Sequence, residues 1–242
     1  MSSILIIGGN SDIGYSTAKI FAKNKYDIHL ASRNIEELNI KKEEIIRLFN
    51  VKCEVTHLDL LKENSINSFF ENNIDSPEVI LVACGFLQKN EVDFEEIICV
   101  NYSSPLKFIE KSIEKYQSQK VLKTIIGISS VAGDRGKKKN SIYSSAKSAF
   151  SSYLDGLRQR LYSNSINVIT VKPGWVKTKM TKNINLPKLM IVDPNLVGNK
   201  IFKAYKSNKN ILYVPEYWFL IMFIYKIVPE FLFKFFLKKS QL

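Results

Sequence analysis

Short apolar runs alternate with longer amphipathic stretches along most of this 242-residue chain. The apolar runs are rich in β-branched residues, which is typical of buried strands. They predict seven strands, at Ile4–Ile7, Ile28–Ala31, Lys52–Leu58, Val79–Ala83, Val121–Ser129, Ile166–Val171 and Ile211–Val214. The intervening stretches predict helices, the clearest at Ile13–Lys25, Ile35–Phe49, Phe94–Gln117 and Ser141–Ser163. This alternation favours an α/β fold: a doubly wound parallel sheet with helices on both faces.

The alternation continues without a repeat or a change of composition to about residue 210. We therefore expect one catalytic domain over residues 1–214 and a hydrophobic helical extension over 215–242. The extension mixes aromatic residues with lysines, and its longest uncharged run is too short to span a bilayer and is followed by Pro229. Residues 217–239 suit a helical pair in the membrane interface, an oligomer interface or a flap over the substrate.

Charge and cysteine content narrow the functional classes. A net charge of +12 indicates a lysine-rich solvated surface, an acidic substrate, an anionic membrane face or nucleic acid. The three cysteines are widely spaced and fit reduced core thiols, and only His29 and His57 could add imidazole ligands, so we expect no metal site. The first apolar run has no cationic stretch before it, which predicts a cytoplasmic catalytic domain.

A glycine-rich turn follows the first predicted strand and opens the first helix. It reads Gly8-Gly9-Asn10-Ser11-Asp12-Ile13-Gly14. Gly8 allows a tight turn, and Gly14 allows the helix to pack close to the sheet with its N-terminus facing a dinucleotide pyrophosphate. The spacing therefore predicts a nucleotide site in a Rossmann fold. Asp12 should repel phosphate unless its side chain turns away, for instance to cap the helix.

The second predicted strand ends in Ala31-Ser32-Arg33. Sites that prefer NAD usually hold an acidic residue here, which accepts a hydrogen bond from the ribose 2′-hydroxyl. Ser32 is neutral, and the Arg33 guanidinium can bind a 2′-phosphate through two hydrogen bonds. The sequence therefore predicts NADP(H) as the cofactor.

Ser130, Tyr143 and Lys147 form the most specific pattern in the chain. Ser130 follows the fifth strand, and Tyr143 and Lys147 are four residues apart, so they share one face of a helix. A free tyrosine has a pKa of about 10. A neighbouring ammonium should lower the pKa of Tyr143 and make it an acid/base, while Ser130 holds the substrate oxygen opposite its hydroxyl.

Together, the glycine turn and the serine, tyrosine and lysine resemble short-chain dehydrogenase/reductases over about residues 3–214. The resemblance implies a catalytic Asn101 that holds a water linked to Lys147, and Thr178 bound to the nicotinamide carboxamide. It also implies that Asp59 contacts adenine and that Gly85 lets the backbone approach the cofactor. Two residues depart from the family: Asp12 replaces a glycine, and Ala83 replaces an asparagine. The full predicted cofactor set is Gly8, Asn10, Ser11, Ile13, Gly14, Ser32, Arg33, Asp59, Leu60, Gly85, Tyr143, Lys147, Pro173, Gly174, Val176 and Thr178.

Within that family, three stretches resemble the decaprenylphospho-2-keto-pentose 2-reductase group of cell-wall assembly. They are residues 82–87, Val131–Arg135 with the following run Lys137-Lys138-Lys139, and the Val214-Pro215 start of the aromatic tail. This narrower resemblance implies a polyprenyl-phosphate-linked 2-keto sugar as substrate. Such an anionic lipid would suit a basic enzyme that contacts the membrane.

Two alternatives stay open. The chain could reduce another carbonyl, such as a fatty acyl, steroid-like or small ketone substrate, or it could be a nucleotide-binding scaffold without catalysis. The complete set of four catalytic residues argues against a scaffold, and no recognisable module supports nucleic-acid binding. The resemblance further implies a homo-oligomer built on the long helices around Asn101 and Tyr143.

Overall fold

The computed structural model describes residues 2–72, 75–87, 94–136, 138–182 and 188–232. Seven parallel strands form one sheet in the order β3-β2-β1-β4-β5-β6-β7. The strands are β1 Ser3–Ile7, β2 Asp27–Ser32, β3 Cys53–His57, β4 Val79–Val82, β5 Thr124–Ile128, β6 Asn167–Pro173 and β7 Ile211–Val214. All seven predicted strands are present, and the order reverses between β1 and β4, the point at which doubly wound sheets bind ligands.

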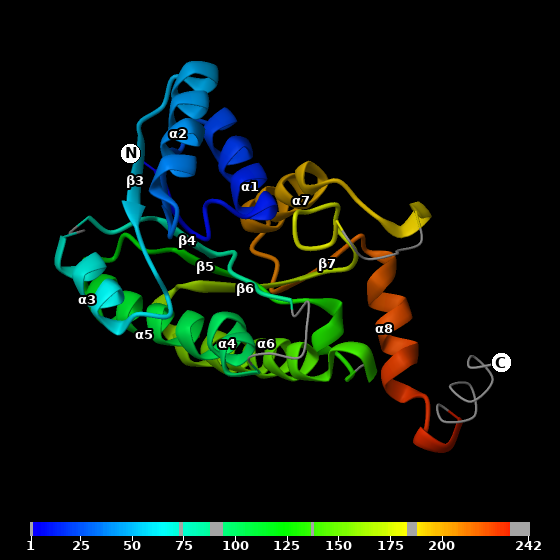
Figure 1. Ribbon diagram of the computed structural model, residues 1–242. Coiled ribbons are helices and arrows are strands. Elements are labelled where there is room, and N and C mark those ends of the chain that lie inside the picture. The colour runs from blue at the N-terminus through cyan, green and yellow to red at the C-terminus, as the bar shows by residue number, and fades with distance from the viewer. Residues whose placement is uncertain (1, 73–74, 88–93, 137, 183–187, 233–242) are drawn as a thin grey trace.

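Helices cover both faces of this sheet, as Figure 1 shows. The helices are α1 Asp12–Lys23, α2 Ile35–Phe49, α3 Glu63–Asn72, α4 Phe94–Ile98, α5 Ser104–Tyr116, α6 Ser141–Leu161, α7 Pro194–Lys206 and α8 Tyr217–Ile227. α1, α2 and α7 cover one face, and α3 to α6 cover the other (Figure 1). The predicted single-domain Rossmann architecture is therefore confirmed.

Strand β1 shows how the sequence divides the core. Ile4 and Ile6 belong to the apolar cluster under α1, α2 and α7, whereas Leu5 and Ile7 belong to the cluster under α3, α5 and α6. Because side chains alternate along a strand, an unbroken apolar run supplies both clusters. This explains why the central strands carry no polar alternation.

The long helix predicted over 94–117 is interrupted in the structure. A single π-helical turn, Cys99–Ser103, separates α4 from α5 and contains Asn101. The Asn101 Nδ2 atom donates to the carbonyl of Ile97 at 2.8 Å. Turns of this kind are frequent at functional sites because they turn one residue out of the regular helical register.

Helix α8 lies at the end of the molecule where β6 and β7 finish, apart from the two helical layers (Figure 1). It buries Trp218 and Met222 and leaves most of its other apolar side chains exposed. The two buried residues are four positions apart and therefore form one stripe of the helix. Among the described residues, none of the helices has the length and apolar character needed to cross a membrane.

Candidate active site

A cavity of about 1370 Å³ opens along the carboxyl ends of the strands. Most of the predicted site residues line it: Gly8, Asn10, Ser11, Ile13, Ser32, Arg33, Asp59, Leu60, Gly85, Ser130, Tyr143, Lys147, Pro173, Gly174, Val176 and Thr178. Asn101 and Gly14 lie behind its wall and are fully or almost fully buried. The cavity is large enough for a dinucleotide together with a substrate.

The glycine turn forms the cavity wall between β1 and α1. Gly8 has a φ of +86°, and a Cβ there would lie 2.8 Å from the Ala83 carbonyl oxygen. A Cβ at Gly14 would lie 2.6 Å from the Gly8 carbonyl oxygen. Both positions therefore require glycine, and they bring the N-terminus of α1 close to the ends of β1 and β4. This arrangement fits the pyrophosphate of a dinucleotide.

Ser11, rather than Asp12, caps helix α1. The Ser11 Oγ atom accepts a hydrogen bond from the Gly14 N–H at 3.1 Å and donates to the Gly8 carbonyl at 2.7 Å. The Asp12 side chain turns away, and its Oδ2 atom accepts the Lys179 N–H at 2.7 Å. The capping role considered for Asp12 is therefore wrong, because the neighbouring serine already occupies that position.

At the other end of the cavity, residues at the carboxyl ends of the neighbouring strands β2 and β3 come together. Ser32 is half-buried and Arg33 is exposed, and both line the cavity together with Asp59. Asp59 also accepts the Leu61 N–H at 3.1 Å. Because Arg33 supplies a cation beside a neutral serine, this end of the cavity fits a phosphorylated ribose.

Tyr143 and Ser130 meet across the cavity from α6 and the end of β5. Ser130 has extended backbone, and its Oγ atom accepts the Ala132 N–H at 3.1 Å. Burial raises the pKa of Tyr143 above its usual value, and a hydrogen bond with Ser130 acts in the opposite direction. We expected a lowered pKa with Lys147 as its cause, but burial sets the direction here.

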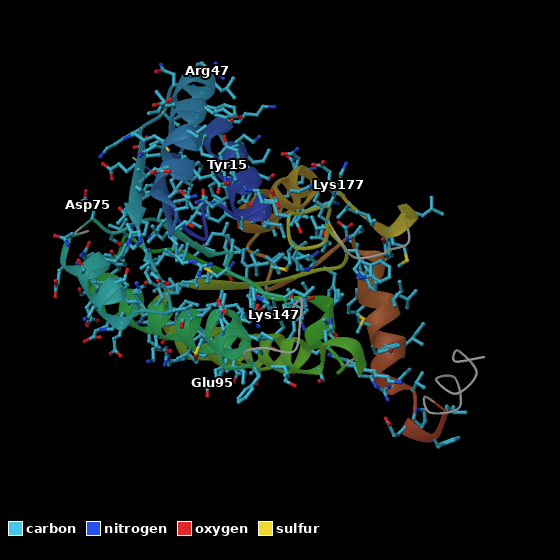
Figure 2. All side chains as sticks on the ribbon, in the orientation of Figure 1. Tyr15, Arg47, Asp75, Glu95, Lys147 and Lys177 are labelled. Carbon is cyan, nitrogen blue, oxygen red and sulfur yellow. The ribbon has the colours of Figure 1, made fainter. Side chains whose placement is uncertain are left out.

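Lys147 is buried between the sheet and α6 (Figure 2). Its Nζ atom lies 6.0 Å from the centre of the Tyr143 ring and donates to the carbonyls of Ile128 at 3.0 Å and Cys84 at 3.3 Å. Burial lowers the pKa of Lys147 to about 8. Its ammonium therefore loses its proton much closer to neutral pH than that of an exposed lysine.

Asn101 and Lys147 converge on the same stretch of backbone after β4. The Asn101 carboxamide donates to the Phe86 carbonyl at 2.7 Å and accepts the Phe86 N–H at 3.2 Å. A Cβ at Gly85 would lie 3.5 Å from Asn101 Oδ1 and 3.8 Å from Lys147 Nζ. These two distances are ordinary van der Waals contacts, and Met180 Cε would be nearer at 3.3 Å. The close approach of the Gly85 backbone to the cofactor stays a prediction.

The segment after β6 forms the wall opposite the glycine turn. Pro173, Gly174, Val176 and Thr178 all line the cavity. The indole of Trp218 from α8 lies so close to Gly174 that a Cβ there would overlap the ring. The aromatic extension therefore packs directly against the cofactor wall.

Two features, one in the cavity wall and one in the structure that supports it, could not be found from the sequence pattern. Tyr225 of α8 lines the cavity, although it lies 78 or more residues from the catalytic ones. The buried Asp134 carboxylate receives Lys172 Nζ at 2.6 Å and the Tyr213 hydroxyl at 2.7 Å. Lys226 Nζ lies 3.4 Å away, so this carboxylate joins the Ser130 loop to β6, β7 and α8. Only tertiary contacts bring these residues together, and no local spacing signals them.

The family model for short chain dehydrogenases matches residues 2–188, more than three quarters of the chain. The chain belongs to the short-chain dehydrogenase family. It is 28% identical to the 3-oxoacyl-(acyl-carrier-protein) reductase of Aquifex aeolicus, an alignment that covers 73% of this chain and 75% of that protein. It is 25% identical to carbonyl reductase family member 4 of Xenopus laevis, over 74% of this chain and 77% of the relative. The chain is accordingly an oxidoreductase of this family.

Solved structures of the family share the fold. A short-chain dehydrogenase from Sphingobium yanoikuyae, in complex with NADPH, superposes with a TM-score of 0.83 at 17% identity, covering 95% of this chain and 97% of the other. The 3-oxoacyl-(acyl-carrier-protein) reductase of Brucella melitensis superposes with a TM-score of 0.78 at 17% identity, over 88% and 89% of the two chains. At these identities the likeness concerns the fold alone.

Proposed function

We propose that this short-chain dehydrogenase is an NADP(H)-dependent carbonyl reductase with Tyr143 as its proton donor. The observation that carries the proposal is the single cavity shared by the glycine turn and the catalytic group. Ser130, Tyr143 and Lys147 line one part of it, and Gly8 and Arg33 line another. A dinucleotide that extends from Arg33 past the glycine turn would place its nicotinamide beside Tyr143.

The direction of the Tyr143 pKa shift supports a proton donor at this position. When bound, the reduced nicotinamide supplies a hydride to the substrate carbonyl carbon. Because burial raises the pKa of Tyr143, its phenol keeps its proton at neutral pH and can donate it to the carbonyl oxygen. Ser130 would hold that oxygen by a hydrogen bond, and Lys147 would resupply the proton through the polar region at Asn101 and Gly85.

The preference for NADP(H) rests on Arg33 beside the neutral Ser32. A structural relative is described in complex with NADPH, which agrees with this choice. We expect NADPH to bind more tightly than NADH, and Arg33→Ala to weaken NADPH binding while leaving NADH binding nearly unchanged. Titration of the protein with each nucleotide, followed by its fluorescence, measures the dissociation constants for NADPH and NADH. Tighter binding of NADH to the wild-type protein would contradict this preference.

Tyr143→Phe tests the catalytic proposal directly. The variant keeps the aromatic ring but lacks the hydroxyl group that donates the proton, so kcat/KM for ketone reduction should fall about 10²- to 10⁴-fold. NADPH binding should stay within about twofold, because the ring still fills the same space. Absence of NADPH consumption by the wild-type protein across a broad panel of ketones and lipid-linked keto sugars would favour the non-catalytic scaffold instead.

For the substrate, we propose a polyprenyl-phosphate-linked 2-keto sugar. A net charge of +12 suits an anionic lipid head, and the residues that line the cavity include Lys138 and, from the apolar helix α8, Tyr225. The side chains of the other two lysines of this basic run, at 137 and 139, lie outside the described part of the structure. NADPH oxidation measured with a polyprenyl-phosphate keto sugar and with a 3-oxoacyl thioester separates the two substrate classes. Faster turnover of the thioester would favour a fatty acyl substrate.

Membrane contact through residues 217–239 belongs to the same proposal. Within the described part, residues 217–232, α8 exposes Phe219, Leu220 and Phe223 by more than half. Residues 233–239 lie outside the described residues. Apolar side chains on a basic protein favour binding to anionic bilayers. We expect the protein to sediment with phosphatidylglycerol vesicles and not with phosphatidylcholine vesicles.

A cytoplasmic location and a homo-oligomer stay predictions. Light scattering with and without detergent would show whether α8 pairs with a second copy of the chain instead of binding a membrane.

A further inference from the structure

Asp12 occupies an unusual place at the entrance of the cofactor cavity. It is the first residue of α1, and its carboxylate points away from the helix axis toward the segment that follows β6. There it accepts the Lys179 N–H at 2.7 Å, across 167 positions of sequence. Asp12 lines both the main cavity and a shallower one that borders α2 and α7. The contact therefore joins the two walls of the cofactor cleft.

The segment that Asp12 holds contains Thr178, the residue expected to bind the nicotinamide carboxamide. Thr178 N–H donates to Thr181 Oγ1 at 3.1 Å, and Thr181 Oγ1 in turn donates to the Val176 carbonyl at 2.6 Å. These bonds make residues 176–181 one compact turn. Because Lys179 directly follows Thr178, fixing the Lys179 N–H fixes the position of Thr178 over the cavity.

A second contact fastens the same residue through its side chain. Lys179 Nζ lies 2.7 Å from Glu37 Oε1 on α2, and Glu37 also pairs with Lys41 at 2.9 Å. Lys41 Nζ donates to the Asn10 carbonyl at 3.1 Å, which returns to the glycine turn. The Lys179 side chain is 71% exposed, so its ion pair should contribute little. The hydrogen bond from the backbone N–H to a carboxylate is the stronger of the two contacts.

We propose that Asp12 is a positioning residue that fastens the turn carrying Thr178 to the glycine turn and so strengthens dinucleotide binding. A glycine at this position would offer no side chain for this contact. Its negative charge near the N-terminus of α1 also opposes the cofactor pyrophosphate, so charge and anchoring act in opposite directions. The identity of the dinucleotide rests on the proposed function, whereas the anchoring does not.

Two substitutions separate these effects. Asp12→Asn removes the charge but keeps an oxygen that can accept the Lys179 N–H. Asp12→Ala removes both the charge and the acceptor. We therefore expect Asp12→Ala to bind NADPH about tenfold more weakly than Asp12→Asn, as measured by fluorescence titration without substrate. Asp12→Asn should bind NADPH at least as tightly as the wild-type protein.

Hydrogen exchange supplies a readout that needs neither cofactor nor activity. In the protein without added nucleotide, peptides that cover residues 176–182 should exchange faster in Asp12→Ala than in the wild type, and Asp12→Asn should retain most of the protection. Lys179→Ala serves as a matched control, because it deletes the ion pair with Glu37 but keeps the backbone N–H. Its exchange should stay within about twofold of the wild type.

Two results would overturn the anchoring role. One is equal NADPH affinity of Asp12→Ala and Asp12→Asn, and the other is unchanged exchange of residues 176–182 in Asp12→Ala. Neither measurement requires turnover, so a protein without reductase activity could still confirm the anchor. Conversely, if the protein is an active reductase but Asp12→Ala and Asp12→Asn bind NADPH equally well, the proposed function stands and the anchoring role of Asp12 is wrong.

Discussion

Helices α6 and α8 border the same cavity, yet α6 buries far more of its side chains than α8 does. α6 lies along the sheet and buries apolar residues such as Phe150 and Leu154, but also the polar Lys147 and Ser151. α8 is apolar along almost its whole length, but it buries only two side chains among its described residues, Trp218 and Met222. Burial in this protein therefore follows position relative to the sheet rather than the hydrophobicity of the segment.

The two helices are also held by different forces. α6 packs its apolar face on the sheet and satisfies its buried ammonium with backbone carbonyls. α8 reaches the body of the protein at its edge, where Arg135 donates to the carbonyls of Tyr225 and Val228 at the C-terminal end of the helix. The neighbouring residue, Asp134, forms ion pairs with Lys172 and Lys226. Charged groups therefore hold the C-terminal part of α8, in addition to the apolar contacts of Trp218 and Met222.

The largest effect on stability should come from Asp134→Asn. The Asp134 side chain is 1% exposed and that of Lys172 is 8% exposed, so the substitution leaves a buried ammonium without its carboxylate. Breaking a buried pair in this way costs about 3–5 kcal/mol in the free energy of unfolding. Asp155→Asn is the matched control, because its pair with Arg158 is 47% exposed on the carboxylate side and should contribute about 0–1 kcal/mol. Equal losses for the two variants in urea denaturation would contradict the anchoring role of Asp134.

Lys147 makes the contribution of α6 to stability depend on pH. Its pKa falls from 10.5 in the unfolded chain to about 8 in the folded protein. Between these values the unfolded chain binds the extra proton, so stability should rise with pH from about 8 to about 10.5 and stay level below pH 8. The wild type should gain about 3 kcal/mol relative to Lys147→Met across this window. The free energy of unfolding of both proteins is measured by urea denaturation at each pH. A difference between them that stays constant from pH 8 to pH 10.5 would contradict the lowered pKa of Lys147.

Two glycine-to-alanine substitutions compare the packing of the helices: Gly174 contacts α8, and Gly156 lies on α6. Gly174→Ala would push a methyl group into the Trp218 indole and displace α8, at a cost of about 1–3 kcal/mol. Gly156→Ala on α6 meets no atom within 4 Å and should stabilise the protein by up to about 1 kcal/mol, because alanine favours the helix. Thermal unfolding measures both changes. A tolerated Gly174→Ala would mean that Trp218 can move without loss of packing.

Much of the framework could be predicted from local sequence. The strand runs and the spacing from Ser130 to Lys147 are local patterns, and the structure places the strands as expected and gathers Ser130, Tyr143 and Lys147 at one cavity. What local patterns could not supply depends on contacts between distant segments. The Asp12 contact spans 167 positions, and the pKa of Tyr143 depends on how deeply the packed sheet buries it. A spacing of four residues shows that Tyr143 and Lys147 share a helical face, but not how much water reaches them.

The smallest effect should come from the outer face of α8. Leu220 and Ile224 are 60% and 50% exposed and lie four positions apart, so both can be replaced by glutamine without opening a cavity. Each change should alter the free energy of unfolding by no more than about 0.5 kcal/mol, since glutamine also favours the helix. Met222→Ala, on the buried stripe of the same helix, should cost about 2–5 kcal/mol. If the double glutamine variant keeps its stability but no longer sediments with anionic vesicles, the outer face contributes to membrane contact and not to the fold. A large loss of stability would instead mean that this face is already covered, as it would be in a pair of chains.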